Sequence, residues 1–179
     1  ELGEDEDLTL KTMNGLNGLL SLTGRLEEAI AVARQAVELR TRRFGANDPG
    51  TLIAAANLAS ALGGAGQLAE AERICRDTIA RAKAVMSDRH PDIIRATSLL
   101  SRLLEQRGEL AEAEALARQA VEAYRQSRQR ESSELALFLN NWANVLLARE
   151  RRGEAEPPLR EAPEIEIREL GERDALGAR

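Results

Sequence analysis

Residues 108–120 read GELAEAEALARQA, a glycine followed by strong helix formers with alanine at helical spacing. The pattern is found 42 residues earlier as GQLAEAERICRDT at 66–78, and 42 residues before that as GRLEEAIAVARQA at 24–36. A degraded copy, ERRGEAEPPLREA, follows at 150–162. Four copies at one fixed spacing predict a repeat protein in which each copy belongs to one supersecondary unit.

Each unit is predicted to be a helical hairpin. The glycine that opens each copy ends a first helix, helix A, and the alanine-rich stretch forms a second helix, helix B. Valine, isoleucine and threonine are too scattered for β-strands. Residues 1–179 are therefore expected to form a single array. Its repeats are predicted at 5–46, 47–88, 89–130 and 131–172, with the truncated start of a further repeat at 173–179. Helix A is expected at 8–22, 49–65, 91–107 and 134–150, and helix B at 25–43, 68–86 and 109–128.

Three repeats open on residues that can cap a helix. Asp48 is predicted to be an N-cap, because its carboxylate can accept a backbone N–H and Pro49 suits the first helical position. Ser132 or Ser133 is predicted to cap the fourth repeat. His90 follows Asp48 by 42 residues, so the two share one position, or column, of the repeat. No nucleophile or carboxylate is spaced so as to make His90 catalytic. We therefore expect His90 to be a loop or cap residue.

The fourth repeat departs from the pattern. Glu150 stands where the other copies have glycine, and Pro157, Pro158 and Pro163 fall within its helix B. An interior proline removes a backbone hydrogen bond and costs about 3 kcal/mol. We therefore expect this helix to be kinked, broken or late to start.

The two ends of the sequence look alike. Residues 1–7 are predicted to be the tail of a loop, and Leu170-Gly171 matches Phe44-Gly45 at the turn between two repeats. Because the chain begins with Glu1 rather than methionine, we interpret it as a fragment of a larger protein. No basic segment followed by an apolar stretch marks a signal peptide, and we expect a cytoplasmic location.

Composition argues against several classes of function. The sequence has 25 Lys and Arg against 30 Asp and Glu, for a net charge of −5 with both signs interspersed, whereas a nucleic-acid-binding domain carries a basic face. The single cysteine, Cys75, excludes an internal disulfide framework and a multi-cysteine zinc site. No apolar run approaches the length of a membrane span. We expect no nucleic-acid partner, no membrane partner and no cofactor.

The pattern L-A-x-x-L-x-x-x-G-x-L-x-E-A, followed by further helix and a D/H-P turn, resembles the tetratricopeptide repeat. The matching residues around the second repeat are Leu58, Ala59, Leu62, Gly66, Leu68, Ala71 and Pro91. In the third repeat they are Leu100, Leu104, Gly108, Leu110, Ala113 and Ala120. The 42-residue spacing resembles that of the kinesin-light-chain type. The resemblance implies an all-α fold, a right-handed α-α superhelical solenoid of about four helix-turn-helix repeats. It also implies a concave face, lined by helix A, that binds an extended peptide or a helix of a partner protein.

Small residues recur at Ala29, Ala71, Ala113 and Ala155, one in each helix B. They would let helix B approach helix A closely. In helix A of the first repeat, Leu16 and Leu20 are expected to share the packing face. Trp142 shares a column with Leu16, and Cys75 shares one with alanines, so both are predicted to be core residues rather than ligand contacts.

Positions of helix A away from the packing stripe should face a ligand. The predicted groove residues are Lys11, Asn14, Asn57, Ser60, Arg95, Ser98, Arg102, Asn140, Asn141 and Asn144. On the same side of helix A, Leu137 shares the repeat position of Lys11 and Arg95, and Leu147 shares that of Glu105. Asparagine is a mediocre helix former whose amide can bond a peptide backbone. Arg95 and Arg102, two turns apart, could hold a carboxylate or an acidic side chain of a partner. The alternative is that these are solvated polar residues on the side opposite the packing stripe.

These observations favour a protein–protein interaction scaffold that binds a partner segment in its groove. The alternative is a self-association module that dimerises through exposed terminal repeats. An enzyme is not expected, because the sequence offers one histidine, no nucleophile–base pair, no metal-ligand cluster and no phosphate loop.

Overall fold

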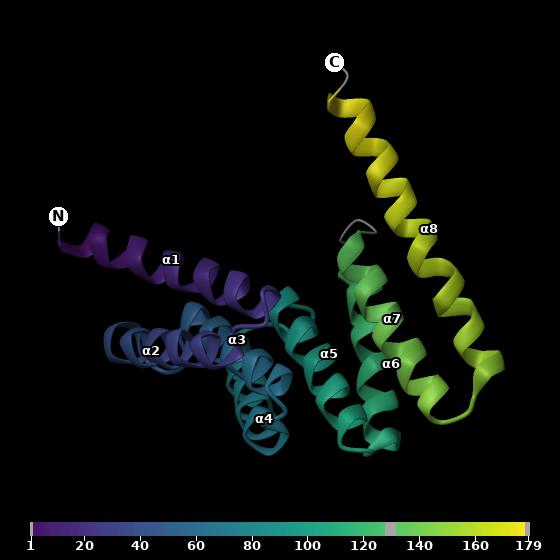
Figure 1. Ribbon diagram of the computed structural model, residues 1–179, viewed down its shortest axis with the longest axis horizontal. Helices are drawn as coiled ribbons and strands as arrows, with labels where there is room; N and C mark the ends of the chain where they lie inside the picture. Colours follow the sequence, from purple (N-terminus) through teal and green to yellow (C-terminus); the bar gives the residue numbers. More distant parts are fainter. Residues whose placement is uncertain (1, 128–131, 178–179) are drawn as a thin grey trace. The chain divides into compact units, whose positions relative to one another are not determined.

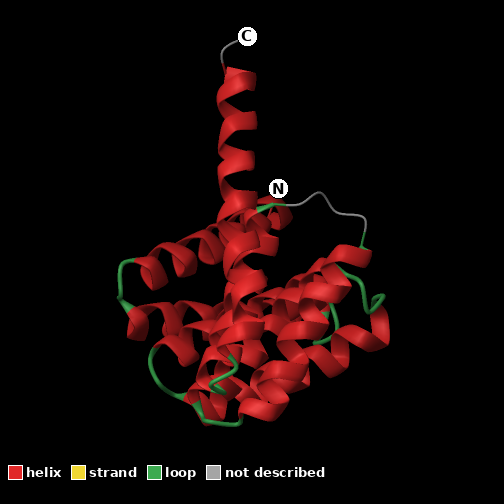
Figure 2. Ribbon diagram, turned by 90° about the vertical axis from the view of Figure 1, so that its right-hand side faces the viewer, coloured by secondary structure: helices red, strands yellow, loops and turns green. Residues whose placement is uncertain are grey.

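The computed structural model describes residues 2–127 and 132–177, with side chains at 9–10, 12–127 and 132–171. Within these ranges every regular element is an α-helix (Figure 2). The chain divides into two compact units, Glu1–Ser87 and Asp88–Arg179. Each unit contains two helical hairpins, as the repeat spacing predicts.

The first unit consists of α1 (Leu2–Leu22), α2 (Leu26–Phe44), α3 (Pro49–Gly64) and α4 (Leu68–Val85) (Figure 1). Helix α2 packs against both α1 and α3, and α3 packs against α4. The bounds of α2, α3 and α4 confirm the predicted helices to within one residue.

The second unit consists of α5 (Pro91–Gln106), α6 (Leu110–Gln126), α7 (Ser133–Ala148) and α8 (Arg152–Gly177) (Figure 1). Helix α6 packs against α5 and α7, and α8 packs against α7. The bounds of α5, α6 and α7 lie within two residues of the predicted ones. The expected end of helix B at residue 128 and the boundary between residues 130 and 131 lie outside the described residues.

Helix α1 corrects one expectation. It begins at Leu2, so the loop predicted at residues 1–7 is wrong for all but Glu1, which lies outside the described residues. The segment is acidic and has no proline, and acidic residues are favourable at the start of a helix because of its macrodipole. The buried stripe of α1 also differs from the predicted one, because Leu20 is buried whereas Leu16 is exposed.

The elbow between helix A and helix B has one backbone geometry throughout the chain. Gly24, Gly66 and Gly108 have φ angles of 74°, 75° and 80°, which is the left-handed region that glycine adopts most easily. The residue after each elbow donates its N–H to the carbonyl five positions back, as Arg25 does to Leu20 at 2.9 Å. This bond is the Schellman closure of a helix C-terminus, so the predicted glycine stops are confirmed.

Glu150 occupies the same position in the fourth elbow. Its φ is 61°, the only positive value at a non-glycine residue in the described part of the chain. Arg149 and Arg151, on either side of it, each donate to Glu114 of α6 at 2.6 Å. Arg151 also bonds Glu154, and these hydrogen bonds raise the pKa of Arg151 and lower that of Glu154. Ion pairs therefore hold an elbow that lacks its glycine.

Alanine lets the two helices of each hairpin approach closely. Ala29, Ala71, Ala113 and Ala155 are all 0% exposed. Two buried polar side chains of helix A form hydrogen bonds with the carbonyls of these alanines. Asn17 donates to Ala29 at 2.8 Å, and Ser101 donates to Ala113 at 2.7 Å. These bonds satisfy polar atoms that would be costly to bury alone.

The predicted caps are confirmed. The Asp48 carboxylate accepts the N–H of Thr51 at 2.9 Å, and Pro49 is the first residue of α3. His90 caps α5 and Ser132 caps α7, each accepting a backbone N–H at 3.3 Å. The core predictions also hold, since Cys75 is buried and Trp142 packs, partly buried, against the core of the second unit.

Helix α8 corrects the expectation of a break. It begins at Arg152 and runs as one helix through all three prolines to Gly177, and it shows no turn at Leu170-Gly171. Packing on one side of the helix explains how it tolerates the prolines: Ala155, Pro158, Ala162 and Ile165 are buried, and α7 lies against it. Tertiary burial overrides the local cost of proline here.

Replacing Glu150 with glycine should stabilise the protein. Glycine removes the Cβ that disfavours a positive φ, which costs about 1–2 kcal/mol, so we expect the free energy of unfolding to rise by about 1 kcal/mol. The control is Glu150→Ala, which removes the carboxylate but keeps the Cβ and should give no gain. Urea denaturation followed by circular dichroism measures both variants, and an equal gain in the two would contradict backbone strain as the cause.

Candidate functional site

Helix A of each repeat provides the predicted groove residues. In the second unit these helices are α5 and α7, which contact each other directly. Arg95 of α5 pairs with Glu134 of α7, and Ser98 of α5 bonds Asn141 of α7. Because the contact on α7 moves forward as the residue on α5 moves forward, the two helices run parallel to each other.

Two predicted groove residues meet in the structure. Asn141 donates its side-chain N–H to the hydroxyl of Ser98 at 2.9 Å. Ser98 is only 3% exposed, so this bond joins α5 to α7 beneath the surface. Ser98 therefore helps to hold α5 and α7 together and does not face a ligand.

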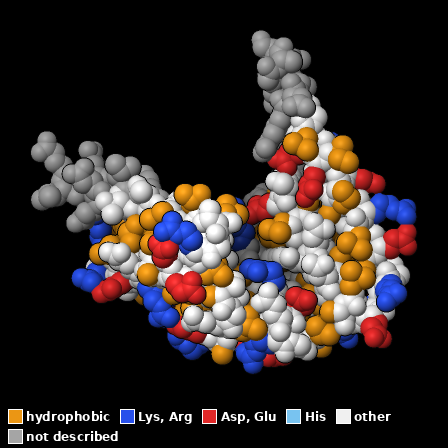
Figure 3. Space-filling model, viewed as in Figure 1, with side chains coloured by type: hydrophobic (Ala, Val, Ile, Leu, Met, Phe, Trp, Pro, Cys, Tyr) orange, Lys and Arg blue, Asp and Glu red, His pale blue; other side chains and the backbone are white. Residues whose placement is uncertain are grey.

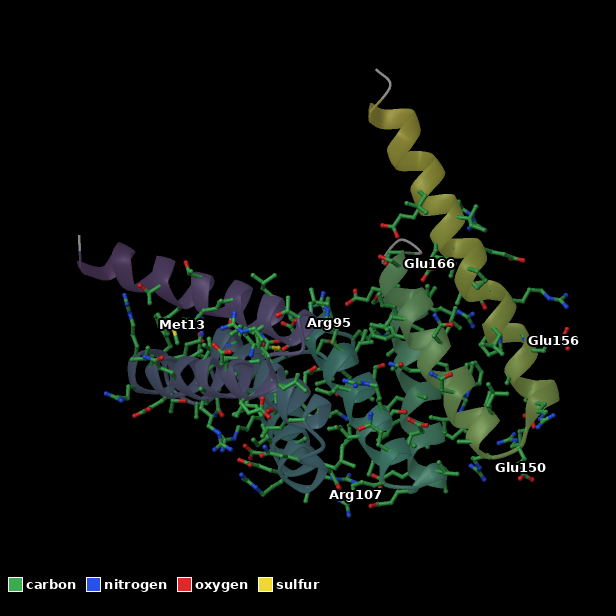
Figure 4. The ribbon with its side chains drawn as sticks, viewed as in Figure 1. Met13, Arg95, Arg107, Glu150, Glu156 and Glu166 are labelled. Carbon is green, nitrogen blue, oxygen red and sulfur yellow. The ribbon has the colours of Figure 1, made fainter. Side chains whose placement is uncertain are left out.

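Arg95 lies near the start of α5 (Figure 4) and is engaged within the chain. It donates to Asp92 at 2.7 Å and forms a hydrogen-bonded ion pair with Glu134. The Glu134 hydrogen bond is the main cause that raises the pKa of Arg95. Two carboxylates of the chain therefore already compensate the positive charge of Arg95, which we expected to bind an acidic partner.

Sequence reasoning missed these two carboxylates. Asp92 lies three residues before Arg95 on the same helix, a spacing that does permit an ion pair and could have been recognised. Glu134 is 39 residues away, and only the packing of α7 on α5 brings it close.

The remaining predicted residues of this unit differ in exposure. Asn144 is exposed, whereas Arg102 and Asn140 are partly buried. Leu137 and Leu147 are 55% and 42% exposed, although both are large and apolar. We call the surface formed by these residues together with Arg95 and Asn141 the α5/α7 face. It combines amide and guanidinium donors with apolar side chains, which suits a peptide ligand.

The corresponding surface of the first unit is formed by α1 and α3, which also contact each other. Asn14 and Asn57 are partly buried and Ser60 is exposed. No hydrogen bond links these three residues to one another in the described part of this unit. The side chain of Lys11 lies outside the described residues.

On the face of each unit that Figure 3 shows, the described charged side chains do not gather into a patch of one sign. Lys and Arg alternate with Asp and Glu on the visible surface of each unit (Figure 3). Among the described residues, no group of three or more His, Cys, Asp or Glu could hold a metal ion. None of the helices in that part of the chain is long and apolar enough to cross a membrane.

Helical hairpins repeated every 42 residues define the class of this protein, an all-α repeat protein of the solenoid type. The tetratricopeptide repeat family matches residues 8–84 and again residues 51–126, which together span more than half of the chain. The chain belongs to the tetratricopeptide repeat family.

Solved structures share this fold. BtubC (BKLC) from P. vanneervenii superimposes with a TM-score of 0.75 at 16% identity over 97% of this chain, which spans 66% of that chain. A protein from Podosopora anserina, described as a putative kinesin light chain with nearly identical TPR-like repeats, gives a TM-score of 0.60 at 20% identity. The match covers 88% of this chain and 94% of that one. A variant of the same Podosopora anserina protein gives 0.59 at 19% identity over the same shares of both chains. No curated protein sequence matches the chain.

The bond between Ser98 and Asn141 should appear as a coupling energy. A cycle of Ser98→Ala and Asn141→Ala is expected to give about 1 kcal/mol of coupling in the free energy of unfolding, because each single variant already loses the bond. The matched control pairs Ser98→Ala with Asn140→Ala, the neighbouring amide to which Ser98 is not bonded, and should be additive. Urea denaturation provides the four free energies of each cycle. The same coupling in both cycles would show that the Asn141 bond does not join the two helices.

Proposed function

We propose that this chain is a non-enzymatic scaffold that binds a peptide or helical segment of a partner protein along its helix A surfaces. Membership of the family supports this, because tetratricopeptide repeats generally mediate protein–protein interaction and are typically non-enzymatic. The proposal treats residues 1–179 as a single array.

The observation that carries the proposal is the exposed composition of the α5/α7 face. Leu137 and Leu147 place apolar surface in solvent on the same side of α7 as Asn140 and Asn144. Exposed leucine next to amide groups is typical of an interaction surface. A single partner segment would cover the leucines and form hydrogen bonds with the asparagine amides.

The helix A surface of the first unit belongs to the same proposal. Lys11, Asn14, Asn57 and Ser60 occupy the columns that α5 and α7 use in the second unit. We include them as ligand-facing residues on the strength of that repeat register. The proposed partner is a protein in the cytoplasm rather than a nucleic acid or a membrane. The mixed charges of the chain argue against a nucleic-acid partner, which would require a basic face.

Two acidic substitutions on the α5/α7 face should abolish binding. The double variant Leu137→Asp/Leu147→Asp places carboxylates where the partner's apolar side chains would lie, so affinity should fall by at least about tenfold, which is ~1.4 kcal/mol. Peptides selected on the wild-type chain from a random phage-displayed library provide the ligands, and fluorescence anisotropy measures their affinities.

The matched control is Ile167→Asp/Leu170→Asp, which changes exposed apolar residues on α8 and should leave these affinities unchanged. A library that yields no binder to the folded wild-type chain would refute the scaffold proposal. Equal losses in the two double variants would refute the assignment to the α5/α7 face.

A second candidate function is self-association, and an apolar stripe on α8 favours it. Leu159, Pro163, Ile167 and Leu170 follow one another at helical spacing, and all four are exposed. Ile167 and Leu170 are 69% and 60% exposed. Apolar surface of this kind on a repeat protein is suited to packing against another helix, including one from a second copy of the chain.

Self-association through this stripe predicts a mass that depends on protein concentration. Light scattering coupled to size exclusion should show the wild-type chain moving from monomer towards dimer as its concentration rises. The Ile167→Asp/Leu170→Asp variant should remain monomeric, because the carboxylates would be buried in the interface, whereas Leu137→Asp/Leu147→Asp should behave as wild type. A wild-type chain that stays monomeric at high concentration rules this function out.

A further inference from the structure

Helix α1 exposes apolar side chains at repeat columns that are buried in other helices A. Leu19 is 59% exposed, whereas Ala61 of α3 and Val145 of α7, in the same column, are each 1% exposed. Leu16 is 42% exposed, and Leu58 in its column is 6% exposed. Helix α3 packs against α2, and α7 packs against α6, so each has the helix B of the preceding repeat beside it. Leu16 and Leu19 lie on the side of α1 that corresponds to this contact.

Helix α8 exposes the matching side of a helix B. Leu159 is 41% exposed, although Ala33 of α2 and Ala117 of α6, in its column, are 2% and 1% exposed. Pro163 is also exposed, whereas Val121 in its column is 1% exposed. Helices α2 and α6 each pack against the helix A of the following repeat. Leu159 and Pro163 lie on the side of α8 that corresponds to this contact.

One ion pair between neighbouring repeats shows where charges meet when repeats stack. Glu114 of α6 accepts hydrogen bonds at 2.6 and 2.7 Å from Arg151, which lies just before the helix B of the next repeat. The corresponding columns hold Glu156 in α8 and Arg25 just before α2. Stacking of α8 on α1 of a second copy of the chain, in the same register, would place Glu156 opposite Arg25.

A second ion pair between neighbouring repeats gives the same match of charges. Arg34 of α2 donates to both carboxylate oxygens of Glu70 of α4 at 2.9 Å. The corresponding columns hold Arg160 in α8 and Glu28 in α2. The same register would therefore place Arg160 opposite Glu28, so both charged positions of α8 would meet an opposite charge on the second copy.

We infer that α8 of one copy of the chain packs against α1 of a second copy, in the register in which α6 packs against α7 within one chain. The inference rests on the self-association proposed above, and it identifies the surface that the apolar stripe of α8 meets. Leu159 and Pro163 lie against the side of α1 that carries Leu16 and Leu19. A pair of α8 helices would also cover the stripe, but it would leave both leucines of α1 in solvent.

The charges at this contact are already compensated in the single chain. Glu156 pairs with Arg160 on α8 at 2.6 Å, and Arg25 pairs with Glu28 at 2.6 Å, and all four side chains are more than half exposed. On association each carboxylate exchanges one arginine for another, so no charge is buried without a partner, which would be costly. Burial of the apolar side chains drives the association, and the charges select its register.

Reversing one charge on either side of the contact should weaken association. Arg25→Glu sets two carboxylates against each other and Glu156→Arg sets two guanidinium groups against each other, so each variant alone should associate at least about tenfold more weakly than wild type. An equimolar mixture of the two variants should associate as tightly as wild type, because each then meets opposite charges on the other. Sedimentation velocity over a concentration series measures the association constants, and circular dichroism checks that each variant is folded.

Two control variants change the net charge by the same amounts away from the contact. Arg42→Glu and Glu38→Arg alter an exposed ion pair of α2, in columns that are exposed in every repeat, and should associate as wild type does. A mixture that fails to recover association, or an equal loss in the controls, would overturn the inference. Association that Arg25→Glu leaves unchanged would overturn the contact with α1 while leaving self-association through α8 intact. A wild-type chain that is monomeric at every concentration would refute both.

Discussion

One backbone constraint recurs through the whole chain, namely a residue with positive φ where helix A turns into helix B. The carbonyl five residues before the end of the elbow accepts the same hydrogen bond in all four repeats, which sets the direction in which helix B leaves. Fully buried alanines then allow the two helices of each hairpin to approach closely. The parallel course of α5 and α7, and with it the candidate binding surface, follows from repeating this geometry in phase.

Signals that are local in the sequence predicted the structure well. Glycine at an elbow, Asp48 before Pro49 and alanine at a hairpin contact each act within one or two helical turns, so their spacing alone was sufficient. The predictions were wrong where tertiary packing, rather than local sequence, determines the structure. Prolines in α8 are tolerated because α7 buries one side of the helix, and Leu16 is exposed although Leu58 and Leu100, at the same repeat position, are buried.

The candidate site shows the same division. Repeat columns identified which side of helix A would face away from the core, and the exposed Asn144, Leu137 and Leu147 lie there. A column cannot tell which side chains will bond to each other across helices. Thus Ser98 and Arg95 were assigned to a ligand, yet the structure uses the first as a buried support and neutralises the second with carboxylates from two helices.

In the fourth elbow, ion pairs flank a glutamate at the position where the other elbows have glycine. Arg149 and Arg151 bind Glu114 from either side of a strained Glu150, whereas the other three elbows are held by a residue that is comfortable with its own backbone. Dissolved ions weaken attraction between partly exposed charges and leave glycine's conformational preference untouched. Ionic strength can therefore weaken or strengthen the attachment of α8 through these pairs, whereas it cannot change the glycine geometry of the other three elbows.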